Sequence, residues 1–233
     1  MTFISVAIPC WEYNGHGTEV LEYSFNKLAI QTFKDFDVVI ADHSIDNEIE
    51  NLCGKWSDKL NIKYIRNDHG RGIVAANLNC AVGNCTGKYI FLLDQDDFAY
   101  NQNSLEKIAE LINNNDDVLW LATEYVHSIN RKDYFNYHVP TLNKYLCITN
   151  TIGTCSCVTV KNQVGLPLFD ENVTYTHDCD WYYQLWKKYG NPHILNEVTI
   201  VNYLWPNSFT SKVTQKLIEK ENKYILEKHN IIL

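Results

Sequence analysis

The stretch Gly87-Lys88-Tyr89-Ile90-Phe91-Leu92-Leu93-Asp94-Gln95-Asp96-Asp97 decides how this chain is interpreted, because an apolar run leads directly into three carboxylates. The apolar run Tyr89–Leu93 predicts a buried strand. Carboxylates this close repel one another, so a fold that gathers them at a strand end usually has a cation to neutralise them. Their oxygens suit Mg²⁺ and Mn²⁺, which often bridge protein oxygens to substrate phosphates. The alternative is an acidic turn or a helix cap, since aspartate is common in both.

The composition of the 233-residue chain is that of an ordinary globular protein, with 45% hydrophobic and 21% charged residues. This length allows one domain with a sizeable core, or one domain with a small appendage. The net charge of −8 disfavours a general nucleic-acid-binding protein, which is expected to carry a basic face. An acidic protein can still bind a diphosphate if a metal ion supplies the positive charge.

The eight cysteines form no CxxC pair and match no common zinc-ribbon spacing. Most lie in apolar segments, where a free cysteine acts as a small buried hydrophobe. We therefore expect reduced thiols in a cytoplasmic protein. The N-terminus lacks the features of a signal peptide, and no apolar stretch approaches the ~20 residues of a membrane span. The chain is expected to be soluble, or at most peripheral to a membrane.

The first half of the sequence alternates strand and helix patterns. The expected strands are Phe3–Ile8, Phe36–Ala41, Ile62–Ile65, Tyr89–Leu93 and Val118–Thr123, and the expected helices are Val20–Phe33, Ile45–Leu60, Ile73–Val82 and Leu105–Ile112. Asn103 and Glu106 are expected to form a capping box at the last of these helices. Near-continuous apolar strands separated by helices predict an α/β fold, with a mostly parallel central sheet flanked by helices on both faces.

The second half of the sequence is less regular. Arg131–Leu146 is expected to form loops, and Thr154–Val160 a strand. Asp178–Tyr189 reads as an aromatic helix that ends at Gly190. Ser211–His229 has the pattern of a charged amphipathic helix.

Polar clusters follow three of the expected strands. They are Trp11-Glu12, Asp42-His43-Ser44 and Asp94–Asp97. In parallel α/β sheets, ligands bind at the carboxyl ends of the strands. Each cluster alone is compatible with a loop cap, whereas the three together predict a ligand site at one edge of the sheet.

Five motifs in this order resemble the family-2 glycosyltransferases of the GT-A fold, over roughly Ser5 to Thr210. They are the opening strand and proline Ile4–Pro9, the acidic turn Asp42–Asp46, the glycine- and asparagine-containing segment Asn67–Asn77, the strand and DxD motif Gly87–Asp97, and Phe169-Asp170-Glu171 with His177-Asp178-Cys179-Asp180-Trp181. A single DxD is weak, but five motifs in order are specific. The resemblance implies one GT-A (Rossmann-like) domain at 1–210, with a nucleotide-sugar-binding half at 1–100 and an acceptor-binding half at 101–210, followed by a C-terminal helix at 211–233.

The resemblance implies an inverting glycosyltransferase that acts in glycan or surface-polysaccharide assembly. The donor would be a UDP-, dTDP- or GDP-linked sugar, the acceptor a glycan or lipid-linked saccharide, and the cofactor Mn²⁺ or Mg²⁺. Asp96 is the expected metal ligand. Asp178 is the expected general base for the acceptor hydroxyl, or alternatively only a helix N-cap. At a helix N-terminus, its pKa is expected to be lowered.

Eight residues are expected on the nucleotide-sugar side: Pro9, Trp11, Glu12, Asp42, Arg71, Asn77, Asp94 and Gln95. Asp42 is expected to accept hydrogen bonds from the base or ribose, or instead to form an Asx turn with Ser44. Trp11 is expected to stack on the base, or to pack at a domain edge. Arg71 would pair with a phosphate or be an ordinary surface arginine. Asn77 alternatively holds backbone loops inside the fold.

Aromatic residues are candidates for the acceptor side, because sugars stack on aromatic faces. They lie in the segment 131–150 and in Trp181-Tyr182-Tyr183, and core packing is the alternative for them.

Two departures from the family pattern bear on the assignment. His177 stands where relatives often have glutamate, and Tyr203–Ser208 contains no histidine to complete metal binding. Asn207 is an alternative ligand there. These departures favour the alternative of a non-catalytic GT-A-like module that binds nucleotide or glycan. A nucleotidyltransferase is disfavoured, because we find no glycine-rich, basic triphosphate-binding loop near the first strand.

Overall fold

The computed structural model describes residues 2–205, 208, 210 and 213–232, and over these residues the chain forms one nine-stranded sheet with helices around it. The strands are β1 (Ile4–Cys10), β2 (Phe36–Asp42), β3 (Ile62–Arg66), β4 (Tyr89–Leu92), β5 (Phe98–Ala99), β6 (Trp120–Ser128), β7 (Phe135–His138), β8 (Val158–Lys161) and β9 (His193–Tyr203). The helices are α1 (His16–Ala29), α2 (Glu48–Trp56), α3 (Val74–Gly83), α4 (Ser104–Asn113), α5 (His177–Tyr189) and α6 (Gln215–Lys228), with a 3-10 turn η1 at Cys155–Cys157.

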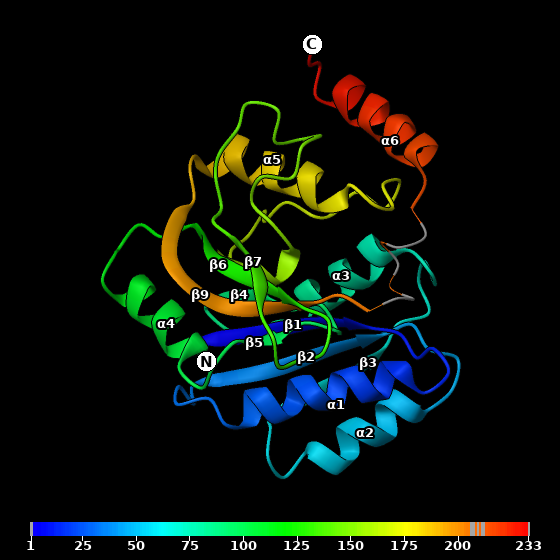
Figure 1. Cartoon of the computed structure of the whole chain (residues 1–233), viewed down its shortest axis with the longest axis vertical. Coiled ribbons are helices and arrows are strands. Elements are labelled where there is room, and N and C mark those ends of the chain that lie inside the picture. The colour runs from blue at the N-terminus through cyan, green and yellow to red at the C-terminus, as the bar shows by residue number, and fades with distance from the viewer. Residues whose placement is uncertain (1, 206–207, 209, 211–212, 233) are drawn as a thin grey trace.

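The sheet order is β3-β2-β1-β4-β8-β6-β9-β5, with β7 paired to β6 (Figure 1). The neighbours β3, β2, β1 and β4 are all parallel. Beyond them β8 runs antiparallel to both β4 and β6, and β9 runs parallel to β6. The α/β fold expected from the sequence, with a mostly parallel sheet flanked by helices, is confirmed.

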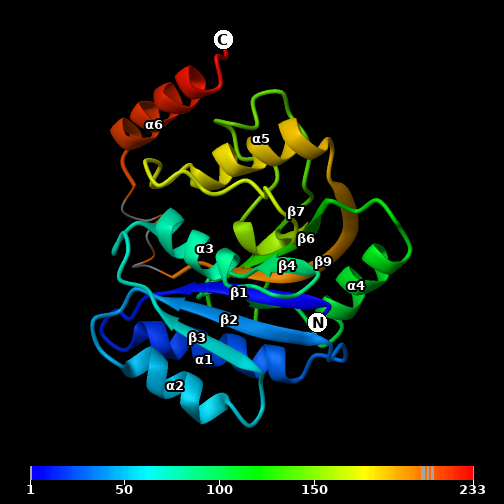
Figure 2. The same ribbon diagram turned by 180° about the vertical axis from the view of Figure 1, so that it is seen from behind.

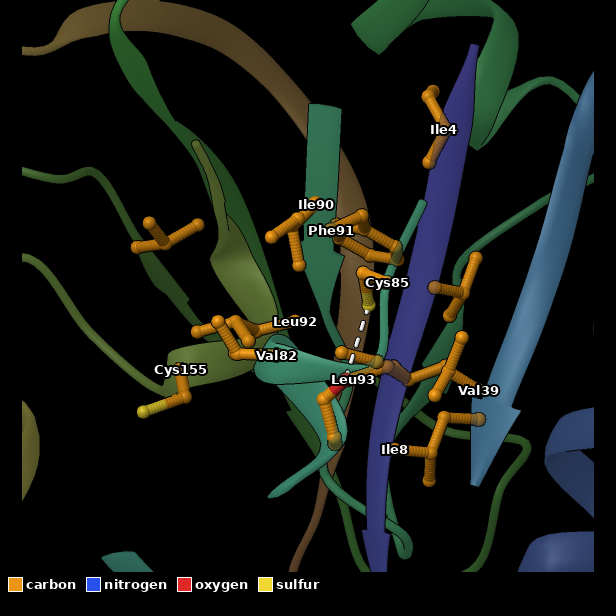
Figure 3. Close-up of a cluster of buried hydrophobic side chains, with 14 of the residues drawn as sticks. Ile4, Ile8, Val39, Val82, Cys85, Ile90, Phe91, Leu92, Leu93 and Cys155 are labelled. Carbon is orange, nitrogen blue, oxygen red and sulfur yellow. Dashed lines mark hydrogen bonds between the residues drawn. The ribbon is translucent and has the colours of Figure 1, made fainter. Parts of the chain in front are cut away.

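Helices cover both faces of the sheet. Figures 1 and 2 show α1 and α2 on one face and α3 and α5 on the other. The core lies around β1 and β4, where Ile4, Ile8, Ile90 and Leu92 are fully buried (Figure 3). Each such side chain contributes on the order of 1.5–3 kcal/mol of burial free energy. The strands that carry the polar clusters are therefore held firmly in place.

The N-terminal ends of α1 and α4 are built differently from the expectation. α1 begins at His16 rather than Val20, because the Glu12 carboxylate caps its first backbone amides. The expected capping box at α4 is wrong, since Asn103 is the N-cap residue but makes no side-chain capping bond. Glu106 instead accepts a hydrogen bond of 2.7 Å from the Thr32 hydroxyl. Long-range contacts have thus replaced the local cap.

The second half contains elements that the sequence patterns did not indicate. β9 is an eleven-residue strand in a stretch with no expected element, and β7 lies within the expected loop region. α6 begins at Gln215, where the Thr214 side chain accepts a bond from Leu217 N–H. Among the described residues, none of the helices has both the length and the apolar character needed to cross a membrane.

Candidate active site

The carboxyl ends of β1 and β2 lie beneath the site and are joined by hydrogen bonds from one side chain of α3. Cys10 lies opposite Asp42 in the parallel pairing, so both strands end at the same level. From α3, the Asn77 side-chain amide donates to the backbone oxygens of Cys10 at 3.0 Å and Ala41 at 2.9 Å. Asn77 is only 4% exposed. It therefore holds the backbone of both strand ends, and its contact with nucleotide stays a prediction.

The loop after β1 is organised by Glu12. Its carboxylate accepts backbone N–H bonds from Gly15 at 2.6 Å and Thr18 at 2.8 Å, and a longer one from Gly17. Its own backbone N–H donates to the Ser44 hydroxyl at 2.7 Å. Glu12 thus satisfies amides that the start of α1 leaves unpaired. Its predicted contact with the donor remains untested.

Gln95 joins the acidic turn to this same loop. Its side-chain oxygen accepts the Trp11 N–H at 2.8 Å, and its amide donates to the Gly17 carbonyl at 2.7 Å. A Cβ at Gly17 would lie 2.5 Å from the Trp11 carbonyl oxygen, so the close approach requires glycine. The Trp11 side chain is 56% exposed at this edge, and Pro9 lies within β1. Stacking of Trp11 on a base is compatible with that exposure.

Asp42 is fully buried at the end of β2. One carboxylate oxygen accepts the Ser44 backbone N–H at 2.7 Å and the Ser44 hydroxyl, which is the Asx turn considered as its alternative role. The other oxygen accepts the Tyr64 hydroxyl at 2.7 Å and lies 3.3 Å from an Arg66 nitrogen. These partners make Asp42 a structural anchor of the loop, and its nucleotide contact stays a prediction.

Arg71 lies between two glycines in left-handed conformations, Gly70 with φ 61° and Gly72 with φ 86°. Its guanidinium donates to the Ser44 carbonyl at 2.9 Å and pairs with Asp68. The arginine is thus directed toward the β2–α2 loop. These contacts leave further N–H groups of the guanidinium for a phosphate, and that contact stays a prediction.

Asp97 joins the acidic turn to η1 and to β9 through hydrogen bonds of its carboxylate. Its carboxylate accepts hydrogen bonds from the hydroxyls of Ser156 at 2.6 Å and Thr154 at 3.1 Å, next to η1. From β9 it accepts the Asn202 amide at 2.9 Å and the Tyr203 backbone N–H at 3.0 Å. This fully buried side chain is the structural member of the acidic turn.

The carboxylates of the turn are crowded and poorly solvated. Burial raises the pKa of Asp96 to about 6, and the negative charge of Asp94 adds to the rise. Burial also raises the pKa of Asp94, against the opposing charge of His177. In residues 2–205, 208, 210 and 213–232, no three His, Cys, Asp or Glu side chains form a group that could hold a metal ion. The atoms that the turn could offer to a metal ion are carboxylate oxygens.

Trp205 is the partner of Asp96 that the sequence reasoning missed. Its indole N–H donates to the Asp96 carboxylate at 3.1 Å. The ring of His16, at the start of α1, lies 5.3 Å from the Trp205 ring. The sequence of Tyr203–Ser208 predicts no histidine ligand and offers Asn207 as an alternative, and it contains no pattern that indicates an indole donor to the acidic turn. Asn207, the alternative metal ligand, lies outside the described residues.

Asp178 lies at the first turn of α5, as the sequence predicted. Its carboxylate accepts the Asn150 side-chain amide at 2.5 Å and the Cys179 backbone N–H at 2.7 Å. The expected lowering of its pKa is wrong. Burial raises the pKa of Asp178, and the charge of Asp94 adds to the rise, which outweighs the opposing effects of His177 and Cys179. The acidic turn and the start of α5 therefore belong to one electrostatic neighbourhood.

Solved structures share this architecture. TarS of Staphylococcus aureus, in complex with UDP-GlcNAc, matches with a TM-score of 0.75 and 19% identity over 99% of this chain and 68% of that chain. The mannosyltransferase PcManGT from Pyrobaculum calidifontis, in complex with GDP-Man and Mn²⁺, matches with a TM-score of 0.65 and 16% identity over 90% of this chain and 59% of that chain. These likenesses show that the chain has the GT-A fold.

The sequence comparison makes the assignment more specific. The profile of glycosyl transferase family 2 matches residues 5–163. The chain therefore belongs to glycosyl transferase family 2 and is a glycosyltransferase. An uncharacterized glycosyltransferase of Rickettsia prowazekii (strain Madrid E) is 24% identical over 235 residues, which cover 94% of this chain and 69% of that protein. The family match includes Asp42 and the acidic turn but ends before Asp178.

Proposed function

We propose that this glycosyltransferase moves a sugar from a nucleoside-diphosphate sugar to an acceptor hydroxyl, with inversion at the anomeric carbon. One observation carries the proposal: the segment 150–154 contacts a carboxylate of the acidic turn and one on α5, because the Thr154 hydroxyl donates to Asp94 at 3.0 Å and the Asn150 amide donates to Asp178 at 2.5 Å. A donor diphosphate at the turn would therefore have a base nearby. The donors bound by TarS and PcManGT, UDP-GlcNAc and GDP-Man, support this substrate class.

In the proposed reaction, Asp178 takes the proton of the acceptor hydroxyl. The hydroxyl oxygen forms a bond to the anomeric carbon, while the bond from that carbon to the diphosphate oxygen breaks on the opposite face. Asn150 orients the carboxylate through its 2.5 Å hydrogen bond. The raised pKa of Asp178 favours this role, because a general base works best when its pKa approaches the working pH.

The acidic turn offers carboxylate oxygens to a divalent cation, and burial raises the pKa values of Asp94 and Asp96, an effect that a bound cation would oppose. Asp96 would be the protein ligand, with Asp94 beside it. Bound Mn²⁺ or Mg²⁺ would offset the negative charge on the departing diphosphate. The Mn²⁺ bound by PcManGT supports this part of the proposal.

The acceptor would approach from the segment 131–150, in keeping with a glycan or lipid-linked saccharide. Asn150 at its end touches the proposed base, and Tyr137 in β7 is 63% exposed. Trp181 and Tyr182 are fully buried and Tyr183 nearly so, so we assign these three aromatic residues to the core and not to the acceptor side.

Thermal stability in the presence of UDP, GDP, dTDP and CDP, each with Mn²⁺ and with EDTA, tests the donor proposal. A ligand that binds only the folded state adds about 2.7 kcal/mol of stability at a hundredfold excess over its dissociation constant. We expect one nucleotide to raise the melting temperature, and to do so more with Mn²⁺. No shift with any of the four would overturn the proposal.

A further inference from the structure

The C-terminal helix α6 is bonded to the turn that precedes the proposed base. Figures 1 and 2 show α6 beside the N-terminal end of α5, on the side of the molecule away from α1 and α2. Its buried side chains are Glu221 and Ile225, four residues apart and so on one face of the helix. Ile225 packs in an apolar cluster with Cys147, Val173 and Tyr183. The helix thus buries one carboxylate together with its apolar anchor.

Glu221 supplies the acceptor atoms for the backbone just ahead of α5. One carboxylate oxygen accepts the Thr174 N–H at 2.7 Å. The other accepts the N–H groups of Tyr175 and Thr176, each at 3.0 Å, and the Thr176 hydroxyl at 3.0 Å. Glu221 is only 4% exposed. One side chain therefore satisfies three consecutive amides, the last of which belongs to the N-cap residue of α5.

A second set of bonds attaches the far end of α6 to the same helix. Asp180, fully buried in the first turn of α5, accepts bonds from Lys228 Nζ at 2.8 Å and His229 Nε2 at 2.7 Å. Lys228 also reaches Asp170 at 2.7 Å. Residues 174–176 and Asp180 flank Asp178 on both sides along the chain. Both flanks are fixed by α6, so the position of Asp178 depends on a segment that the family match does not include.

We propose that Glu221 is a positioning residue for catalysis, which sets the start of α5 through residues 174–176 and so places the Asp178 carboxylate against the acceptor hydroxyl. The inference rests on the proposed role of Asp178 as the base. It makes α6 part of the catalytic unit, whereas the sequence pattern presented it as a separate C-terminal helix. Misplacement of a reacting group by about 1 Å can cost on the order of 100-fold in rate.

The test compares Glu221→Gln with Glu219→Gln on the same helix, where Glu219 is exposed. Both variants remove one negative charge and keep the side-chain shape. Turnover is read as release of UDP from UDP-GlcNAc or GDP from GDP-Man, with water or an added saccharide as acceptor. We expect Glu221→Gln to lower kcat about 10- to 100-fold with KM within about twofold, because only the base is displaced. Glu219→Gln should match the parent protein.

Hydrogen exchange gives a readout that needs no substrate. Glu221→Gln should speed exchange at the amides of Thr174, Tyr175 and Thr176 and leave β1 and β4 unchanged. Unchanged exchange at these amides, or an unchanged kcat, would overturn the inference. If Glu221→Gln does not fold, Thr176→Val replaces it, since this change removes only the hydroxyl donor. An unaltered kcat in that variant would count against the inference.

Asp178→Asn, measured alongside, separates this inference from the function on which it rests. If Asp178→Asn still turns over, the base assignment and the positioning role both fail. If Asp178→Asn is inactive while Glu221→Gln behaves as the parent protein, only the positioning role fails.

Discussion

Carboxylates are buried at the acidic site and also at the interface between α5 and α6, but their pKa values shift in opposite directions. The pKa of Asp94 and Asp96 is raised, whereas the pKa of Asp170 and Glu221 is lowered. At the site, burial raises the pKa of Asp94 and Asp96. At the interface, burial alone would raise the pKa of Asp170, but hydrogen bonds from Lys228, Asn172 and Tyr224 lower it to about 2. Glu221 behaves likewise, because backbone bonds from residues 174–176 outweigh its burial and lower its pKa.

The difference lies in the supply of donors. A buried carboxylate that accepts several N–H bonds or a lysine is stabilised in its charged form, and it fixes one part of the fold to another. A buried carboxylate with few hydrogen-bond donors is destabilised in its charged form. Binding of a cation or a proton would then stabilise it. By this criterion Asp170, Asp180 and Glu221 hold parts of the fold together, whereas we expect Asp96 and Asp178 to take part in the reaction. Asp97 is an intermediate case, with several donors but strong crowding by its neighbours.

The largest expected effect is on the proposed base. Asp178→Asn should lower the transfer rate by about 10²- to 10⁴-fold, because the amide cannot accept the acceptor proton. Nucleotide binding should stay near normal, since the donor half is untouched. The measurement is kcat together with the affinity for the stabilising nucleotide. Asp58→Asn, at an exposed turn after α2, is the control. Survival of turnover in Asp178→Asn would show that the base lies elsewhere.

Next in size is the loss of a structural carboxylate. Asp180→Asn removes the buried charge that pairs with His229 and one of the two carboxylates that pair with Lys228, so we expect a loss of about 3 kcal/mol in unfolding free energy. Urea denaturation at neutral pH measures it. Glu227→Gln, which removes an exposed carboxylate from the same helix, should change stability by less than about 0.5 kcal/mol. Equal effects from both variants would contradict the distinction between the two regions.

A smaller effect should appear as a pH dependence at Asp170. Its folded-state pKa of about 2 lies below the ordinary value of 3.8, so it stabilises the fold above pH 4 and loses this contribution as pH falls toward 2. Asp170→Asn should therefore be about 1.5 kcal/mol less stable than the parent protein at pH 7, which is less than the full shift implies because solvent screens this half-buried carboxylate. The difference should shrink as the pH approaches 2. A difference that is constant with pH would mean that charge is not its cause.

The smallest expected effect on stability is that of Asp96→Asn, which should stabilise the protein, whereas the two preceding substitutions should destabilise it. Asp96→Asn removes a carboxylate whose pKa of about 6 shows that its ionised form is disfavoured in the fold. At pH 7.5 in EDTA we expect unfolding free energy to rise by about 1 kcal/mol, and stability of the parent protein to fall as pH rises from about 4 to 6. The same variant should lose the Mn²⁺-dependent part of nucleotide binding. Destabilisation by Asp96→Asn would place Asp96 among the structural carboxylates.

The first half of the fold could be predicted because most of its strands are buried on both faces, whereas β3 at the edge of the sheet is partly exposed. Buried strands appear as short apolar runs, and β1, β2, β3 and β4 each lie within about two residues of the expected range. β9 was missed because Asn196 and Glu197 interrupt its apolar pattern at an irregular part of its pairing with β6. The capping box failed because Thr32, distant in sequence, competes for Glu106.

The candidate site was likewise predictable only in part. Asp96 and Asp178 were visible as residues in motifs, whereas their partners Trp205 and Asn150 come from other segments and carry no motif of their own. Glu221 did leave a signal. It lies at four-residue spacing between Leu217 and Ile225, on the face expected to be apolar. A carboxylate at such a position predicts a buried partner, although it does not name the partner.

The sequence by itself determined the class of fold, the strand that leads to the acidic turn, and the identity of the carboxylates. These features depend on local patterns of apolar and charged residues, which the order of the chain contains directly. Only the tertiary structure decided which carboxylates are satisfied and which are not. That outcome depends on donors that Lys228, Ser156, Asn202 and the backbone of residues 174–176 bring from distant parts of the chain. The hydrogen-bond donors around a buried carboxylate decide whether its charged form is stabilised, so Asp180 anchors α6 to α5, whereas we expect Asp178 to be a reactive group.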